Sequence, residues 1–320
     1  MDSATPTVRS TESYIVVSPG TYVRAIESTV VGSSPLGTVV IATGRAEFCE
    51  KYSECARVLQ GLNYNTVIFD WRGQGLSIRK LRDRQKGHID SYEEYISDLE
   101  RVISHATALY GNGAIYILAH SMGGHIALRA MARRPGLIRA AILTAPMIDI
   151  ARNRIQFWLF EILSLVMVTC GLGHVYVAGE RGYSELDRDF SRNILTHNSA
   201  NFVHKHQIIA INPDLAPGGP TWAWLHATLR SIRKLRAEAT AGLVTSPVLI
   251  VSAGDDRVVS NPAQADLNAF LPNGELVCIS GSYHEILQEG PVIQAALWDY
   301  AKAFLARVTH GVPPAACAEH

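Results

Sequence analysis

A serine in a tight turn is the residue of this sequence whose surroundings most clearly suggest chemistry. Ser121 lies in the segment Ala119-His120-Ser121-Met122-Gly123-Gly124, after an apolar run and before a helical pattern. A sharp strand–turn–helix connection strains the backbone of its central residue, so the residues two positions away must be small, as Ala119 and Gly123 are. The helix N-terminus beside the hydroxyl favours developing negative charge. We therefore predict that Ser121 is a nucleophile; the alternative is an ordinary N-cap serine.

A serine nucleophile needs a base, and the base needs a carboxylate that orients it. His284 lies in Gly281-Ser282-Tyr283-His284-Glu285, directly after a predicted strand, and Asp255 and Asp256 follow an earlier one. Open α/β sheets place their sites at the carboxyl ends of strands, and the chain order serine, acid, histidine fits such a site. The pattern indicates His284 as the base and leaves Asp255 and Asp256 as alternative acids.

Other chemistries find less support. We interpret His120 and His125, beside Ser121, as packing residues, and His197, His204 and His206 lack carboxylate and cysteine partners at metal-binding spacing. The sequence contains no phosphate-binding glycine loop or cofactor motif, so we predict neither a metal nor a cofactor. The five cysteines have neither metal spacing nor a CxxC pattern, for which a reducing compartment is the simplest interpretation.

Composition narrows the class of protein further. A chain of 320 residues accommodates about two domains, or one large α/β domain with an insertion. Lys+Arg (29) balance Asp+Glu (29), which removes the basic charge expected of a nucleic-acid-binding protein. Hydrophobic residues make up 48% and argue against disorder. Residues 1–13 have no apolar stretch of the secretory type, so we expect a cytoplasmic location.

The elements that must position these residues alternate along the chain. Pro19-Gly20 separates two β-branched runs that predict a hairpin, and helical patterns appear at about 91–110, 121–134 and 292–308. Further strands are predicted at Thr38–Ala42, Thr66–Phe69, Ala114–Leu118, Ala140–Leu143, Val248–Ser252 and Leu276–Ile279. The later runs are almost continuously apolar, as in strands buried on both faces. This alternation predicts an α/β fold with a mostly parallel central sheet flanked by helices.

The alternation stops between Met147 and about Ala241, which predicts a helical cap inserted into one core. The predicted organisation is a loose lead-in at 1–13, a first part of the core at 14–146, the cap at 147–240, a second part of the core at 241–311 and a tail at 312–320.

With these segments assembled, the sequence resembles the α/β-hydrolases, and within them the bacterial lysophospholipase and monoacylglycerol lipase group, often classed with the serine aminopeptidases. The resemblance is carried by six stretches: Gly44–Tyr52, Asp70–Ser77, His120–His125, Leu143–Met147, Gly254–Val259 and Tyr283–Leu287. It implies the α/β-hydrolase fold with Ser121 as nucleophile, His284 as base and Asp256 as acid. It also implies an oxyanion hole formed by the backbone N–H groups of Met122 and Arg45. The loop Asp70–Ser77 is interpreted as structural.

The same resemblance implies a serine hydrolase that cleaves carboxylic esters of single-chain lipids, lysophospholipids or monoacylglycerols, through an acyl-enzyme. The alternatives are a short-chain carboxylesterase, a non-catalytic binding protein of this fold, and an aminopeptidase. The aminopeptidase would need cap carboxylates to hold an α-amino group, for which the candidates are Glu180, Glu185, Asp187 and Asp189.

The apolar segment Ile155–Thr169 is the cap feature most relevant to a lipid substrate. It is shorter than the roughly 20 residues of a membrane span, and its polar residues Gln156, Glu161 and Ser164 share one arc of a helix. We interpret it as a lid that lines the acyl chain with Phe157, Trp158 and Phe160 and makes peripheral membrane contact. The alternative is a cap helix buried against the core.

A basic stretch follows in the cap. Its cations could meet a phosphate headgroup or form a solvated helix face; they are Arg230, Arg233, Lys234 and Arg236.

Overall fold

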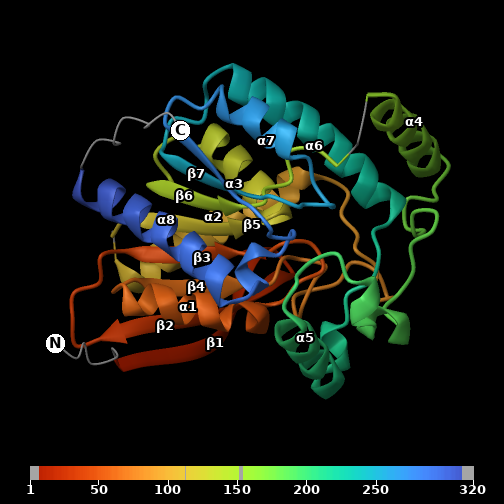
Figure 1. Ribbon diagram of the computed structural model, residues 1–320. Coiled ribbons are helices and arrows are strands. Elements are labelled where there is room, and N and C mark those ends of the chain that lie inside the picture. The colour runs from red at the N-terminus through yellow and green to blue at the C-terminus, as the bar shows by residue number, and fades with distance from the viewer. Residues whose placement is uncertain (1–6, 112, 151–153, 312–320) are drawn as a thin grey trace.

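The computed structural model describes residues 7–111, 113–150 and 154–311, and in these residues eight strands form one sheet (Figure 1). The strand order is β1-β2-β4-β3-β5-β6-β7-β8, antiparallel from β1 to β4 and parallel from β4 to β8. This arrangement confirms the predicted mostly parallel sheet. The strands are β1 (Thr7–Ser18), β2 (Thr21–Val31), β3 (Thr38–Ala42), β4 (Asn65–Phe69), β5 (Ile115–His120), β6 (Ala140–Thr144), β7 (Val248–Ala253) and β8 (Gly274–Ile279).

Helices cover both faces of this sheet, and further helices lie beside it (Figure 1). They are α1 (Ser53–Gly61), α2 (Tyr92–Tyr110), α3 (Met122–Arg133), α4 (Arg154–Thr169), α5 (Ser199–Ile211), α6 (Trp222–Thr240), α7 (Asn261–Asn268) and α8 (Pro291–His310). Right-handed crossovers place α1 on one face and α2 and α3 on the other, and α8 returns to the face of α1 (Figure 1). The start of α2 is set by a reciprocal capping box between Ser91 and Glu94.

Burial follows the position of each strand in the sheet. Every residue of β3, β4, β5, β6 and β7 is buried, as their continuous apolar runs predict. The prediction of two-sided burial is wrong for β8, where Leu276 is 36% exposed. This strand has only β7 as a neighbour, so it is the edge of the sheet and less of it is covered.

The predicted loose lead-in is wrong for residues 7–13. The strand β1 begins at Thr7, which pairs with Val31 of β2, and the hairpin ladder continues to its turn. The sequence hides this strand because its first half is mainly polar and exposed, as edge strands often are. Residues 1–6 and the predicted tail at 312–320 lie outside the described residues.

The last helix of the cap, α6, packs directly against the core. Thr228 of α6 hydrogen-bonds Tyr92 of α2 at 2.9 Å, and Glu238 forms an ion pair with Arg129 of α3 at 3.0 Å. Much of α6 belongs to the main hydrophobic core, although the predicted boundary at residue 240 groups this helix with the cap. In Figure 1, α4 and α5 stand at one end of the molecule, beside the sheet rather than on its faces.

The cap helix α4 has its polar side inward and its apolar side outward. Glu161 and Ser164 are buried, and Glu161 forms an ion pair with Arg233 of α6. By contrast, Trp158 is 54% exposed and Ile162 is 58% exposed. The alternative of a cap helix buried against the core is therefore wrong for the outer face of α4. Throughout the described residues, no helix is both long enough and apolar enough to cross a membrane.

Candidate active site

Ser121 occupies a strained turn between β5 and α3. Its backbone angles are φ 50° and ψ −114°, a region that residues with a side chain rarely adopt. A Cβ on Gly123 would lie 2.3 Å from the carbonyl oxygen of Ala42, so only glycine lets α3 start this close to the end of β3. The parallel register aligns Ala42 with Ala119 of β5, which brings the loop after β3 to the level of Ser121.

The three residues predicted to act together are in hydrogen-bond contact. Nε2 of His284 lies 3.0 Å from Oγ of Ser121, and Nδ1 of His284 lies 2.7 Å from Oδ2 of Asp256. The other carboxylate oxygen of Asp256 accepts the N–H groups of Val258 at 2.7 Å and Val259 at 3.0 Å. The side chains of Asp256 and His284 are almost completely buried.

The structure distinguishes Asp256 from Asp255, the two aspartates between which the sequence pattern does not choose. Burial raises the pKa of Asp256, but the hydrogen bonds from His284 and from the two backbone N–H groups outweigh burial, and the net pKa lies below its usual value. Asp256 is therefore a carboxylate at neutral pH. Asp255 is exposed and contacts the histidine loop through its backbone, by donating its N–H to the carbonyl of Ser282.

Two backbone N–H groups beside Ser121 remain available to a ligand. The N–H of Arg45 lies between those of Gly44 and Ala46, which donate to the side chains of Glu47 and Gln74 at 2.5 Å each. Among the described residues, no acceptor is found for the N–H of Arg45 or of Met122. Ala46 has φ 61°, so this loop, like the serine turn, is strained. The arrangement suits an oxyanion formed at Ser121.

A buried charge cluster supports both loops, and the sequence analysis missed it. Glu47 hydrogen-bonds Lys51 and Tyr52, and Nζ of Lys51 lies 2.7 Å from Glu285, the neighbour of His284. Burial lowers the pKa of Lys51, but the two carboxylates outweigh it and raise the pKa overall. The signal was present in the sequence, since Glu47 and Lys51 are four residues apart within the Gly44–Tyr52 stretch.

His120 packs against the proposed base His284. Its ring centroid lies 4.8 Å from that of His284, and its Nδ1 lies 3.0 Å from the carbonyl oxygen of Thr144. Burial lowers the pKa of His120 to about 4, so the ring is uncharged beside His284 at neutral pH. His125 is fully buried between the carbonyl of Met147 and the hydroxyl of Ser231, as the packing interpretation predicts.

The predicted acyl-chain residues divide between two environments. Phe157 and Phe160 are partly buried and pack against the main core. Trp158 is half exposed, with the guanidinium of Arg233 4.9 Å from its ring centroid. Trp158 therefore faces outward, where it is better placed for contact with an external surface than for contact with a chain bound at Ser121.

The basic residues of α6 are mostly neutralised. Arg233 pairs with Glu161, Lys234 with Glu93 at 2.8 Å and Arg236 with Asp149 at 2.6 Å. These ion pairs favour the interpretation of a solvated, salt-bridged face over that of a headgroup site.

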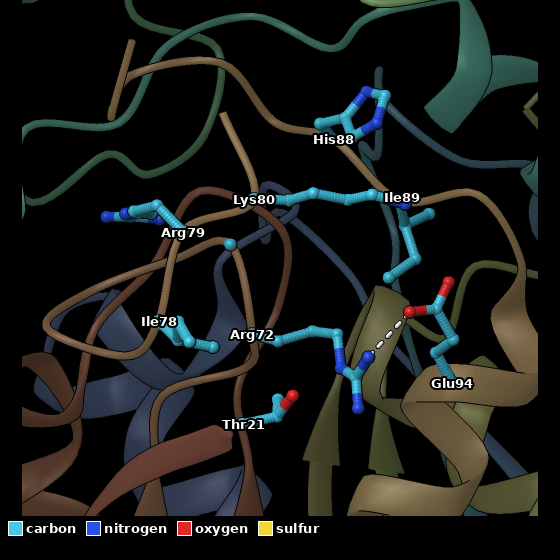
Figure 2. A pocket seen from close by; sticks show the side chains of 9 residues that line it. Thr21, Arg72, Ile78, Arg79, Lys80, His88, Ile89 and Glu94 are labelled. Carbon is cyan, nitrogen blue, oxygen red and sulfur yellow. Dashed lines mark hydrogen bonds and ion pairs between the residues drawn. The ribbon is translucent and has the colours of Figure 1, made fainter. Parts of the chain in front are cut away.

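The Asp70–Ser77 loop is held by structural contacts. Asp70 is fully buried and accepts the N–H groups of Cys49 and Leu76. Figure 2 shows the pocket of about 260 Å³ beside this loop, with Arg72 hydrogen-bonded to Glu94. Arg72 also pairs with Asp98, so its charge is used within the protein.

An α/β sheet with a serine at the strained turn after a central strand, and with an acid and a histidine after later strands, defines an α/β-hydrolase. The chain belongs to the family described as serine aminopeptidase S33, whose model matches residues 33–291.

Individual relatives agree with this membership. Probable lysophospholipase L2 of Haemophilus influenzae is 32% identical, over 78% of this chain and 78% of that protein. Lysophospholipase L2 of Escherichia coli K12 is 33% identical, over 78% of this chain and 75% of that protein. The fold is similar to that of a soluble variant of monoglyceride lipase from Saccharomyces cerevisiae, solved with a substrate analogue. That comparison has a TM-score of 0.72 and 18% identity, and it covers 96% of this chain and 99% of the other.

Proposed function

We propose that the protein is a serine hydrolase that cleaves carboxylic esters of single-chain lipids, as a lysophospholipase or a monoacylglycerol lipase. The observation that carries the proposal is the continuous hydrogen-bond chain from Asp256 through His284 to Ser121. The relatives named lysophospholipase and monoglyceride lipase support a lipid substrate.

In the proposed mechanism Ser121 attacks the acyl carbonyl carbon while Nε2 of His284 takes the hydroxyl proton. Asp256 holds the imidazole and stabilises its charged form. The N–H groups of Met122 and Arg45 donate to the oxyanion, and the intermediate collapses when His284 passes its proton to the leaving alcohol. Water then attacks the acyl-enzyme by the same route and releases the fatty acid.

The aminopeptidase alternative has less support in the cap. Three of its four candidate carboxylates are engaged with neighbouring cap residues: Asp187 with Arg181, Glu185 with Arg188, and Asp189 with Ser191. Two of the four charges, those of Asp187 and Glu185, are thereby neutralised and are not available to the α-amino group of a peptide.

Fatty-acid release from lysophosphatidylcholine and from monoacylglycerol tests the proposal, with Ser121→Ala as the blank. We expect release from at least one substrate, and covalent labelling of Ser121 by a fluorophosphonate. Failure of the wild type to be labelled would favour the non-catalytic binding protein. Release of amino acids from peptides without lipid hydrolysis would favour the aminopeptidase. A rate that falls steeply with acyl-chain length would favour the short-chain carboxylesterase.

The outward apolar face of α4 supports a proposed contact with a lipid surface. We expect Ile162→Glu to weaken binding to phosphatidylcholine vesicles at least tenfold, because burial of such a side chain contributes roughly 1.5–3 kcal/mol. Hydrolysis of a water-soluble short-chain ester should stay within about twofold, since Ile162 is 58% exposed.

The matched control is Val292→Glu, which adds the same charge at a position that is 85% exposed on α8. Vesicle sedimentation measures both variants. Equal binding of Ile162→Glu and the wild type would contradict the membrane role of this face.

Glu47→Gln tests the proposed positioning role of the buried charge cluster. The amide cannot accept from Gly44, Lys51 and Tyr52 together, so the loop that carries Arg45 should move. We expect kcat to fall by about 10²-fold, the typical effect of a misplacement near 1 Å, with KM changed less than about threefold. The rate of fluorophosphonate labelling should fall in parallel. A stability loss measured by thermal unfolding, with unchanged kcat, would show that the cluster is only structural.

A further inference from the structure

Lys205, on α5, is a partly buried cation without an ion-pair partner in the described residues. No hydrogen bond or ion pair to its ammonium group is found in the described part of the chain. Burial lowers the pKa of Lys205, whereas the charges of Glu285, Glu47 and Asp187 act to raise it. Glu285 and Glu47 both pair with Lys51, and neither forms an ion pair with Lys205. An ammonium group without an ion-pair partner is available to a bound anion.

A hollow of about 370 Å³ lies beside this lysine, between α5 and the short turns at 185–192. Two carboxylates line it, but Asp187 pairs with Arg181, and Asp189 caps a turn by accepting the N–H and hydroxyl of Ser191. Arg192 also lines the hollow, and its side chain forms no ion pair within the described residues. Three cations and two carboxylates line the hollow, so its lining carries one net positive charge.

His206, which also lines the hollow, has a ring nitrogen without a partner among the described residues. It is 8% exposed, and its Nδ1 lies 2.6 Å from the hydroxyl of Tyr183, whose oxygen is also approached by Arg188 at 3.4 Å. The Nε2 of His206 is buried and has no partner in the described structure.

The hollow adjoins the proposed catalytic loops. Leu195 lines it, and the carbonyl of Leu195 accepts the N–H of Glu285 at 2.8 Å, next to His284. A second hollow of about 260 Å³, lined by Arg45 and Ala46, shares its cap-side wall with the first. The two hollows therefore run from the loop of Arg45 to Lys205.

We propose that this hollow binds the phosphate of a lysophospholipid headgroup, with Lys205 as its main cationic ligand and Arg192 as a second. An ammonium group recognises phosphate as a point charge, which suits a single lysine in a polar hollow. The inference rests on the proposed ester hydrolysis and deepens it, because it favours lysophospholipids over monoacylglycerols as substrates.

The test compares two substrates that share an acyl chain, 1-oleoyl lysophosphatidylglycerol and 1-oleoylglycerol, at equal mole fraction in neutral detergent micelles. We expect Lys205→Met to raise KM for the phospholipid at least tenfold, with kcat for both substrates and KM for 1-oleoylglycerol within about twofold. Lys205→Arg should retain most of the preference, and Arg192→Gln should raise KM for the phospholipid about threefold.

Lys234→Met is the matched control, because it removes a lysine paired with Glu93 on the exposed side of α6, and its substrate ratio should equal that of the wild type. Should Lys205→Met fold poorly by thermal unfolding, Lys205→Gln replaces it. Inorganic phosphate is the second probe, and we expect it to compete with the phospholipid in the wild type and not in Lys205→Met.

Four results overturn the inference while leaving the proposed function standing. They are an unchanged substrate ratio in the Lys205 variants, equal rises of KM for both substrates, wild-type activity on 1-oleoylglycerol alone, and competition by inorganic phosphate without any effect of Lys205→Met on the substrate ratio. The last result would assign the hollow to free phosphate. A wild-type protein that hydrolyses neither lipid would instead contradict the proposed function itself.

Discussion

Ser121→Ala is expected to lower kcat for lipid-ester hydrolysis by at least ~10³-fold and by as much as ~10⁶-fold, the range seen when a serine nucleophile is removed. The variant keeps the free N–H groups of Met122 and Arg45, but His284 has no hydroxyl proton to take. What remains is the catalysis that binding and the oxyanion hole supply to direct attack by water. Fatty-acid release under substrate saturation measures the effect.

Folding should be unaffected by this change. Alanine tolerates φ 50° about as poorly as serine does, and the lost hydroxyl bonds only His284 among the described contacts. Thermal unfolding within a few degrees of the wild type is the control. Peptide mapping of the fluorophosphonate adduct should find it on Ser121. Residual activity above about a thousandth of the wild type would contradict the assignment.

Asp256→Asn is expected to lower kcat by roughly 10³–10⁴-fold, as in other triads whose acid is neutralised. An asparagine amide satisfies fewer of the contacts made here, because Asp256 accepts from His284, Val258 and Val259 together. The imidazole then loses the charge that stabilises its protonated form and can adopt the unreactive tautomer. Steady-state kinetics on the same lipid ester give the comparison.

Asp255→Asn is the matched control, since it makes the same chemical change one residue away. Asp255 is exposed and holds its loop through the backbone N–H, which asparagine keeps. We expect its kcat to stay within about threefold of the wild type. A larger loss in Asp255→Asn than in Asp256→Asn would reverse the choice of acid.

The features predictable from the sequence were those with a local physical cause. The strands around Ser121 are read from continuous apolar runs, and the serine turn from the small residues Ala119 and Gly123. The sequence pattern left the choice between Asp255 and Asp256 as the acid open, because adjacent residues of the same type fit the pattern equally well. The direction of each carboxylate is set by a turn in which Val258 and Val259 present their N–H groups to Asp256.

Features that depend on distant pairing could not be predicted in this way. A helical projection groups Glu161 and Ser164 on one face of α4, but it does not say which face is inward. That choice is made by Arg233, about seventy residues later, which pairs with Glu161. The link from Lys51 to Glu285 spans an even longer stretch of chain, and the polar strand β1 is recognised only through its pairing with β2.

Three of the four non-glycine residues with positive φ in the described structure lie around the proposed catalytic serine: Ser121 itself, Ala46 on the oxyanion loop and Ala145, which follows β6. The backbone N–H of Ser121 donates to Thr144, so the turns at Ser121 and Ala145 are directly coupled. Each such residue costs of order 1 kcal/mol or more of folding stability.

At these three turns, a change that increases thermal stability is therefore expected to lower the catalytic rate. Glycine at these positions would relax the backbone and favour a protein that survives heating, but the loosened loops would hold the reacting groups less firmly. An engineer who wants a more durable enzyme should leave these three turns alone and stabilise the chain elsewhere, for instance along the exposed β1–β2 hairpin.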